Sequence, residues 1–303
     1  MRPDTNGVLI VDKPAGKSSA RVLAEVKRLC KVKKAGHAGT LDPFATGVLV
    51  CCLNQATRLA RFFLHDWKKY KGTLHLGIET DTQDLTGQVL AENSAATVTA
   101  EDIRRAAHRF TGAIEQVPPA YSALKHKGTP LYRLARNGRP VQKPPRKVTI
   151  AKLTILEITL PFVSFEVTCS AGTYIRTLCA DIGQQLGCGG HLKALRRVES
   201  SGFTIAEAVS LDDLHRLAGS GMSDKHLISL ADSLRNVPAV KVDSKLANRI
   251  KHGQQVTGDE LTDGRDLEPS AAFKVLDESG RLLAVMTSPA NGRRLNYSCV
   301  FNH

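Results

Sequence analysis

The sequence predicts an α+β protein with two domains, and three observations support this prediction. The chain has 303 residues, which at ~150 residues per domain corresponds to about two domains. Its 42% hydrophobic and 23% charged residues are typical of a globular protein and argue against disorder, collagen and coiled coil. Short apolar runs alternate with amphipathic segments up to residue 236, and short β-like runs rich in glycine follow. We therefore expect a larger domain over 1–236 and a small, mostly β domain over 237–303.

The first predicted elements are a strand and an amphipathic helix. An apolar run over residues 7–12 predicts a short buried strand. Ser18 and Ser19 are typical N-cap residues for the helix that follows. The apolar residues of this helix that share one face are Val22, Leu23, Val26, Leu29 and Cys30. A glycine-punctuated loop over 36–47 separates the helix from a second buried strand over 48–53.

More strands and helices are predicted farther along the chain. Residues 69–77 are typical of a strand, and 80–87 of an acidic turn. Thr99 and Asp102 have the spacing of a capping box, which predicts the start of a helix. The segment 162–187 predicts a strand, a turn and a helix. The apolar face of that helix consists of Ile175, Leu178, Ile182 and Leu186.

One segment is strongly basic. The chain has 42 Lys and Arg against 29 Asp and Glu, and its net charge of +13 favours binding to phosphates or another anionic surface. Residues 116–156 contain nine of these cations, six prolines and no Asp or Glu. Because surfaces of mixed charge suffice for solubility, we favour an insertion that binds phosphates over a solvated basic loop.

Several classes of protein and site are not expected. The apolar run over 8–11 is too short for a signal-peptide core, and 48–53 is far shorter than the ~20 residues of a membrane-spanning helix. The seven cysteines include no C-x-x-C pair, so we expect reduced thiols in a cytoplasm and neither a disulfide framework nor a zinc site. Residues 15–18, AGKS, resemble the end of a phosphate-binding P-loop, but Val11 stands where its first glycine is required.

The loop over residues 36–43 has the features of a ligand-binding turn. Gly36 and Gly39 allow a ligand to approach the backbone closely, and Pro43 keeps Asp42 in extended geometry. Taken alone, Asp-Pro is more typical of a turn than of a catalytic site. The longer string GHAGTLDPFATGVLV, however, resembles the catalytic signature of the TruB family, bacterial enzymes that make pseudouridine in the TψC arm of tRNA.

Four other segments are similar to blocks of the same family, in the same order. They are GVLIVDKPAGKSS (7–19), KKYKGTLHLGIETDTQDLTG (68–87), QVPPAYSALKHKGTPLYRLARNG (116–138) and CSAGTYIRTLCADIGQQLGCGGHLKALRR (169–197). The third is similar to the thumb insertion that pinches the tRNA arm. The sequence departs from the family pattern at Val50 and at Asn54-Gln55, which lie beyond the catalytic loop.

The resemblance implies the pseudouridine-synthase fold. This fold is a mixed, largely antiparallel sheet flanked by helices, with a basic thumb here expected over about 112–148. The expected RNA-binding residues of the thumb are Lys125, Lys127, Arg133, Arg136 and Arg139. The terminal domain is loosely similar to the PUA-like RNA-binding domain of the family.

The resemblance also assigns residues to a site. Asp42 corresponds to the nucleophile, and Arg176 to the arginine that pairs with it. Tyr70 corresponds to a tyrosine that stacks on the uracil and helps to transfer protons. The other substrate-binding positions are His37, Tyr174 and Leu195. Asp81 and Asp84 either support the cleft or form only an acidic turn, and Lys13 with Pro14 is expected to shape the floor of the pocket.

Pseudouridine formation is an isomerisation, so the expected enzyme needs no cofactor and no metal. It requires a carboxylate nucleophile and a uridine that is flipped out of its RNA loop. The resemblance implies position 55 of tRNA as the target and a monomer, and the long insertion over 116–147 favours an enzyme that uses no guide RNA. The short apolar runs predict no membrane partner. The alternative is a non-catalytic module that binds or folds tRNA with the same basic surface.

Overall fold

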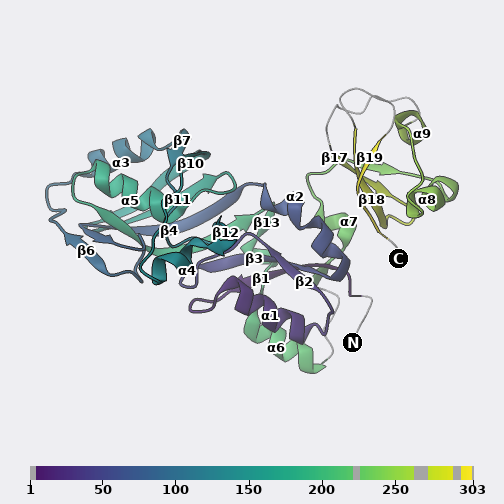
Figure 1. Ribbon diagram of the computed structural model, residues 1–303, viewed down its shortest axis with the longest axis horizontal. Coiled ribbons are helices and arrows are strands. Elements are labelled where there is room, and N and C mark those ends of the chain that lie inside the picture. The colour runs from purple at the N-terminus through teal and green to yellow at the C-terminus, as the bar shows by residue number, and fades with distance from the viewer. Residues whose placement is uncertain (1–4, 221–225, 263–271, 289–294, 302–303) are drawn as a thin grey trace.

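The computed structural model describes residues 5–220, 226–262, 272–288 and 295–301. Its largest feature is an eleven-stranded sheet whose main path has the order β14-β1-β3-β12-β4-β11-β10-β7 (Figure 1). The strands of this path are β1 Gly7–Lys13, β3 Thr46–Leu53, β4 Lys68–Leu76, β7 Gly112–Gln116, β10 Arg146–Thr159, β11 Phe162–Cys169, β12 Gly190–Ser200 and β14 Val209–Ser210. Three short strands pair at its side, namely β2 Ala35–Ala38, β13 Phe203–Thr204 and β15 Leu227–Ile228.

The sheet is mixed and mainly antiparallel. Strands β12, β4, β11, β10 and β7 pair antiparallel in succession, as do β1 and β3. Two pairings are parallel, β1 with β14 and β3 with β12. The second of these places Arg196 and Arg197 beside Thr46 and Gly47, so a segment late in the chain lies next to the loop that precedes β3.

Helices cover the sheet through separate hydrophobic clusters. Helices α3 (Ala100–Arg109) and α5 (Ile175–Gln185) pack against the strands around β4, and α1 (Ser19–Leu29) and α6 (Leu211–Ser220) pack against β1 and β3. Ser18 is the N-cap of α1, and Thr99 forms the predicted capping box of α3 with Asp102. The predicted α+β fold, a mixed sheet flanked by helices, is therefore confirmed.

The remaining elements are short. They are η1 Asn54–Leu59, α2 Ala60–Leu64, β5 Ile78–Thr80, β6 Val89–Glu92, β8 Lys125–His126, β9 Thr129–Pro130, α4 Leu131–Arg136, η2 Ile205–Glu207 and α7 Leu230–Ser233. Strands β5 and β6 form one hairpin, and β8 and β9 form another. In the part of the chain that the structure describes, no helix is long and apolar enough to cross a membrane.

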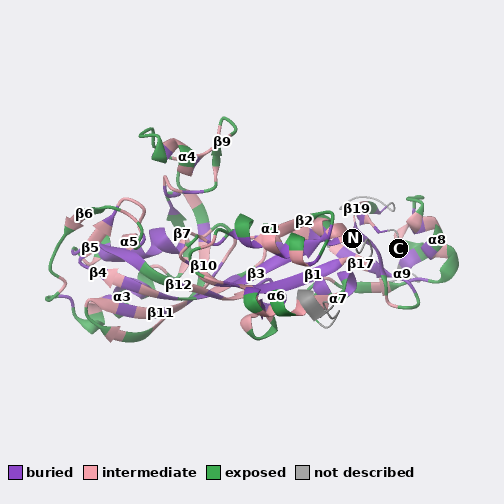
Figure 2. Cartoon of the chain, turned by 90° about the horizontal axis from the view of Figure 1, so that it is seen from below, coloured by how far each residue is buried: buried purple, intermediate pink, exposed green. Residues whose placement is uncertain are grey.

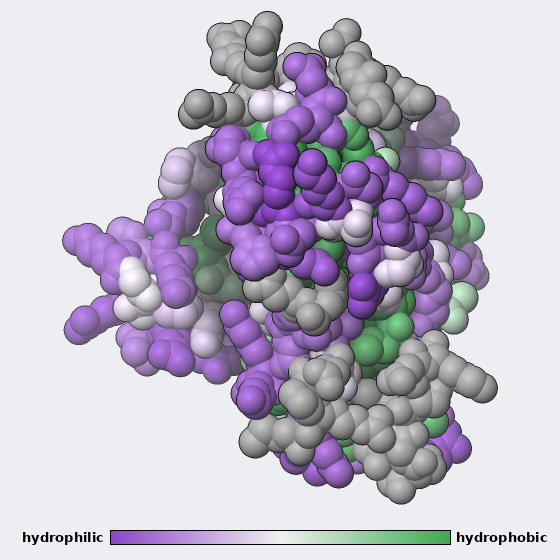
Figure 3. All heavy atoms as spheres, turned by 90° about the vertical axis from the view of Figure 1, so that its right-hand side faces the viewer, coloured by the Kyte–Doolittle hydropathy of each residue, from purple (hydrophilic) through white to green (hydrophobic). Residues whose placement is uncertain are grey.

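A second, four-stranded sheet lies at the C-terminal end. It contains β16 Ala239–Lys241, β17 Ala272–Leu276, β18 Leu282–Thr287 and β19 Asn296–Val300, accompanied by α8 Ser244–Lys251 and α9 Gly258–Thr262. Its Val285 and Phe301 share one hydrophobic cluster with Phe63 and Phe203 of the larger part. Figure 3, which views this end of the molecule, shows mainly hydrophilic side chains with small apolar areas. The expected small β-rich unit is present, and it packs directly on the larger sheet.

The basic segment projects from the body as a thumb. Residues 117–145 connect β7 to β10, and Figure 2 shows their helix α4 and strand β9 standing clear of the main sheet. Leu131 and Ala135 of α4 are buried, which gives the projection a small core of its own. The five cations expected to bind RNA, Lys125, Lys127, Arg133, Arg136 and Arg139, are all exposed.

Candidate active site

The loop that carries Asp42 joins β2 to β3, and two buried polar side chains hold its backbone through hydrogen bonds. The Ser19 hydroxyl accepts a hydrogen bond from the Leu41 amide (2.8 Å) and donates one to the Leu41 carbonyl (3.0 Å). The Lys13 ammonium donates to the carbonyls of Pro14 (2.8 Å), Lys17 (2.7 Å) and Pro43 (3.1 Å). Asp42 is thus held between two anchored neighbours, Leu41 and Pro43.

Lys13 is fully buried, and burial lowers its pKa to about 8. The nearby Asp42 carboxylate opposes this shift because it favours the charged ammonium. A buried cation whose three donors are all used by carbonyls is well suited to holding a loop in one conformation. Lys13 therefore positions the loop and also places a positive charge near Asp42.

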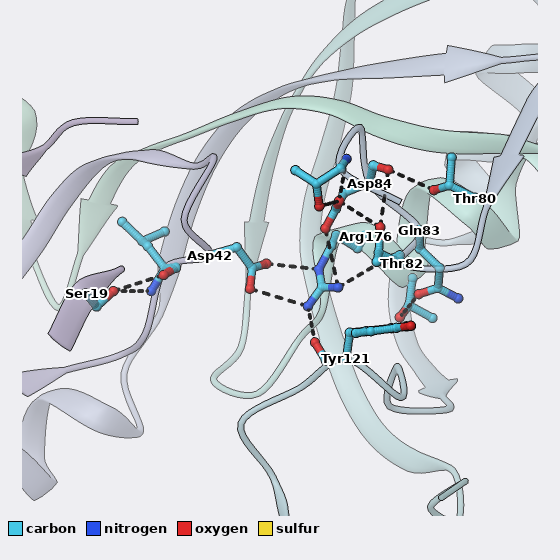
Figure 4. A network of polar contacts seen from close by, with 11 residues as sticks. Ser19, Asp42, Thr80, Thr82, Gln83, Asp84, Tyr121 and Arg176 are labelled. Carbon is cyan, nitrogen blue, oxygen red and sulfur yellow. Dashed lines mark hydrogen bonds and ion pairs between the residues drawn. The ribbon is translucent and has the colours of Figure 1, made fainter. Parts of the chain in front are cut away.

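Asp42 forms an ion pair with Arg176, the second residue of α5 (Figure 4). The Arg176 Nε lies 2.9 Å from one Asp42 carboxylate oxygen, and Nη2 lies 3.4 Å from the other. The Arg176 side chain is only 4% exposed, whereas that of Asp42 is 34% exposed. The guanidinium thus lies behind the carboxylate and leaves part of it accessible from outside.

Arg176 is itself held on its other side. Its Nη1 donates to the Thr82 carbonyl (2.8 Å) and lies 3.5 Å from a carboxylate oxygen of Asp84. The same Asp84 accepts hydrogen bonds from the hydroxyls of Thr82 (2.8 Å) and Thr86 (2.6 Å). Nη2 donates to the Tyr121 carbonyl (2.9 Å) at the base of the thumb. The sequence alone left open whether Asp81 and Asp84 support the cleft. Asp84 is buried and contacts Arg176 of the site.

The pKa of the Asp42 carboxyl is raised above its ordinary value. Burial is the largest cause, and the negative charge of Asp84 adds to it. The Arg176 guanidinium and the Lys13 ammonium act in the opposite direction because they stabilise the ionised form. The site therefore combines the two features of an activated carboxylate, which are partial removal from water and fixed cations that keep it charged.

Tyr70 and Leu195 lie together beneath the loop. Both belong to the hydrophobic cluster that also contains Leu41 and Ala45, and they are 8% and 9% exposed. Burial raises the pKa of the Tyr70 hydroxyl, while a hydrogen bond from Arg197 opposes that shift. The structure thus places the predicted stacking tyrosine and the predicted leucine in one cluster with Leu41, the residue before the predicted nucleophile.

Arg197 is a central residue of the site that the sequence did not single out. It is 1% exposed, and it donates to the Val48 carbonyl (2.7 Å) and the Gly39 carbonyl (3.0 Å). It therefore ties β12 to both ends of the loop. Gly39 has φ +87°, and a Cβ there would lie 3.3 Å from the Arg197 guanidinium, so this position favours glycine.

His37 and Tyr174 lie at two sides of the loop. The His37 Nδ1 is buried without a hydrogen-bond partner among the described residues, and burial together with Arg197 lowers the pKa of the ring. The Tyr174 ring lies under the Arg146 guanidinium, 4.7 Å from its centre, and the Tyr174 backbone is held by both ends of the Gln116 amide. Among the described residues no hydrogen bond joins the Tyr174 hydroxyl to Asp42, so the predicted role of Tyr174 in substrate binding stays a prediction.

A cleft of about 650 Å³ opens beside the loop. Pro43 and Phe44 of the loop form one wall, and Leu195 lies in another. The basic side chains at its edge are Lys71, Lys193 and Arg196. A mainly apolar cleft with cations at its edge is suited to a base or sugar whose phosphates stay outside.

The P-loop-like residues do not form a phosphate site. The Lys17 ammonium pairs with Glu25 at 2.9 Å, and Ser18 caps α1. Within the described residues, no group of three His, Cys, Asp or Glu side chains is arranged to hold a metal ion. The chemistry that this site offers is that of a carboxylate, a guanidinium and a phenol.

Replacing Lys13 with methionine is expected to move the acid limb of the pH–rate profile to higher pH. Lys13 lowers the pKa of Asp42, so its removal raises that pKa and delays ionisation as the pH increases. The profile is measured as kcat/KM on an RNA substrate, with Lys17→Met as control because Lys17 pairs with Glu25 instead. An acid limb that stays in place or moves to lower pH would contradict this role.

Comparisons with known proteins agree with the geometry. A family model described as TruB family pseudouridylate synthase (N terminal domain) matches residues 27–175, and one described as tRNA pseudouridylate synthase B C-terminal domain matches residues 176–237. The solved structure titled "Crystal Structure of a Cbf5-Nop10-Gar1 Complex" is 25% identical with a TM-score of 0.75, covering 98% of this chain and 84% of that one.

Curated relatives cover nearly the whole chain. The chain is 46% identical to tRNA pseudouridine synthase B of Syntrophus aciditrophicus, covering 92% of this chain and 90% of the relative. It is 42% identical to the protein of the same name from Syntrophotalea carbinolica, covering 95% and 94%. The corresponding values for Burkholderia pseudomallei are 45%, 92% and 92%. The chain therefore belongs to the TruB family of pseudouridylate synthases, which are isomerases.

Proposed function

We propose that this protein converts the uridine at position 55, in the T arm of tRNA, to pseudouridine, with Asp42 as the nucleophile. The ion pair between Asp42 and the buried Arg176 is the observation that carries the proposal. Curated relatives at 42–46% identity are named tRNA pseudouridine synthase B, and this supports tRNA as the substrate. The activity is placed in the cytoplasm, where tRNA is modified in bacteria.

The reaction exchanges one glycosidic bond for another. The N1–C1′ bond of uridine breaks, the base rotates, a C5–C1′ bond forms, and C5 loses its proton. A carboxylate assists as nucleophile, and Asp42 has the exposure and the fixed cation that this requires. Arg176 keeps Asp42 charged and oriented, because two of its nitrogens face the two carboxylate oxygens.

The target base reaches Asp42 only if it leaves its RNA loop. Tyr70 and Leu195 then form the surface on which the uracil rests, with the Tyr70 hydroxyl available for proton transfer. His37 lies on β2, one residue before its end, and we assign its ring to the space that the flipped nucleotide leaves. We assign Tyr174, whose backbone amide donates to Gln116 of β7, to the side of the bound uridine nearest the thumb.

Neutralising Arg133, Arg136 and Arg139 in the thumb is expected to weaken tRNA binding and to flatten its dependence on salt. Each phosphate contact that is lost reduces the slope of log K against log salt by up to about 0.9. All three side chains are exposed, so the variant keeps its fold. Binding is measured by titration at several salt concentrations, and an unchanged affinity and slope would show that the thumb does not grip RNA.

We also propose that residues 237–303 form a PUA-like RNA-binding domain, and that the enzyme acts as a monomer without a guide RNA. The thumb supports the second point, because its exposed cations offer a surface for RNA in the same chain (Figure 2). The proposed reaction is an isomerisation of uridine, and we expect it to require no cofactor, no metal ion and no nucleotide as an energy source.

The purified protein, incubated with an unmodified tRNA transcript and no cofactor, tests the proposal. Release of tritium from C5-labelled uridine reports the loss of the C5 proton. We expect release that stops at one equivalent per tRNA. Tight binding without any release would instead support the alternative, a non-catalytic module that binds or folds tRNA.

A further inference from the structure

A second basic surface lies at the end of α1, away from the thumb. Its five cations, Lys27, Arg28, Lys31, Lys33 and Lys34, fall within eight residues and are all exposed. Four of them line a groove of about 690 Å³ together with Ala24 and Val32. We refer to these five residues as the α1 basic patch.

The positive charge of the patch is not neutralised by the described residues around it. None of the five side chains forms an ion pair or a hydrogen bond within the described ranges. The nearest acidic residue on α1, Glu25, is occupied by Lys17 at 2.9 Å and His215 at 3.9 Å. On the packed helix α6, Asp213 is bound by Ser210 and Arg216.

Helix stability explains only part of the patch. Lys27 and Arg28 lie in the last turn of α1, where a cation stabilises the helix dipole by about 0.3–1 kcal/mol. Lys31, Lys33 and Lys34 lie beyond the last residue of the helix, where this stabilisation falls off. Five like charges in so short a segment repel each other, so an anionic partner is the more direct explanation for their clustering.

The patch has a defined position relative to Asp42. The first residue of α1, Ser19, contacts Leu41 next to Asp42, and α1 has 11 residues. At ~1.5 Å per residue the helix is roughly 16 Å long, so its basic end lies about one helix length from the loop. Figure 1 places α1 between the thumb and the C-terminal sheet, and Figure 2 shows α1, β2 and the thumb on the same side of the main sheet.

We propose that the α1 basic patch binds backbone phosphates of a part of tRNA that lies outside the T-arm hairpin. This inference rests on the proposed function. A hairpin gripped by the thumb reaches Asp42 with its loop and ends there, so phosphates farther along the same face come from another segment of the RNA. In a folded tRNA that segment is the one that packs against the T loop. The patch thus gives the enzyme additional phosphate contacts with folded tRNA that the isolated hairpin cannot make.

The experiment compares two RNAs and two matched variants. The RNAs are an unmodified full-length tRNA transcript and the T-arm hairpin alone. The patch variant is Lys27→Gln with Arg28→Gln, and the control is Arg104→Gln with Arg109→Gln, which removes the same charge from exposed positions of α3. Affinity is measured at several salt concentrations, and pseudouridine formation is measured on both RNAs.

We expect the patch variant to bind full-length tRNA about 3- to 10-fold more weakly and to lose up to about two units of salt slope. Its affinity for the hairpin and its turnover of the hairpin should stay within twofold of the native values. Equal losses on both RNAs, no loss on full-length tRNA, or an equal loss in the α3 control would each overturn the inference. Failure of the proposed function is read separately, as absence of pseudouridine in the hairpin treated with native protein.

Discussion

The Asp42→Asn variant is expected to lose pseudouridine formation by a factor of about 10⁴ or more, because it removes the only carboxylate of the described residues that faces both Arg176 and the opening of the site. Asparagine has nearly the same shape, so the loop keeps its contacts to Ser19 and Lys13. Arg176 retains Asp84 and the carbonyls of Thr82 and Tyr121. The variant should therefore fold and bind tRNA within about tenfold of the native protein, or ~1.4 kcal/mol.

Single-turnover tritium release from a C5-labelled T-arm transcript measures this loss, and a binding titration with the same RNA measures affinity. Asp12→Asn is the matched control, because Asp12 pairs with the partly exposed Arg196 at 2.7 Å near the same loop. That variant should keep its rate within several-fold. Comparable rates in native protein and Asp42→Asn would remove Asp42 from the mechanism.

Replacing Arg176 with lysine is expected to reduce kcat by about 100-fold and to destabilise the fold by about 3 kcal/mol. The guanidinium contacts Asp42 and Asp84 at once, and a lysine ammonium lacks the forked geometry to do so. Both carboxylates are then poorly compensated in a site that is largely removed from water. The acid limb of the pH–rate profile should also move to higher pH, because Arg176 lowers the pKa of Asp42.

Denaturant unfolding and pH–rate profiles measure the two effects on the same samples. Arg105→Lys provides the control, since Arg105 is 57% exposed in its pair with Asp102 on α3 and such pairs contribute only about 0–1 kcal/mol. If Arg176→Lys is as stable and as active as Arg105→Lys, the buried network does not organise the nucleophile.

Local signals in the sequence predicted most of the elements. The apolar run over 7–12 is within β1, the run over 48–53 is within β3, and the capping box at Thr99 starts α3 as predicted. These signals depend on neighbours a few residues apart, so the sequence contains them in full. The stretch over 191–197, for which no strand was predicted, is part of the central strand β12, because its burial is set by strands distant in the chain.

The sequence predicted only those site residues that lie in recognisable local motifs. The motif that contains Asp42 and the block that contains Arg176 identified the pair, although 134 residues separate them. Arg197 was missed because its role depends on the parallel pairing of β12 with β3, which no local pattern reveals. Asp84 stayed ambiguous, since the bonds of its side chain to Thr82 and Thr86 are those of an ordinary turn. The ion pair of that side chain with Arg176 depends on a residue distant in the chain.

The most direct measurement of the central claim maps pseudouridine at single-nucleotide resolution in one unmodified tRNA transcript. The transcript is treated with native protein or with Asp42→Asn, without any added cofactor. A single modified uridine in the T loop with native protein, and none with the variant, is the predicted result. An unmodified T loop after treatment with native protein, or the same modification by both proteins, would contradict it.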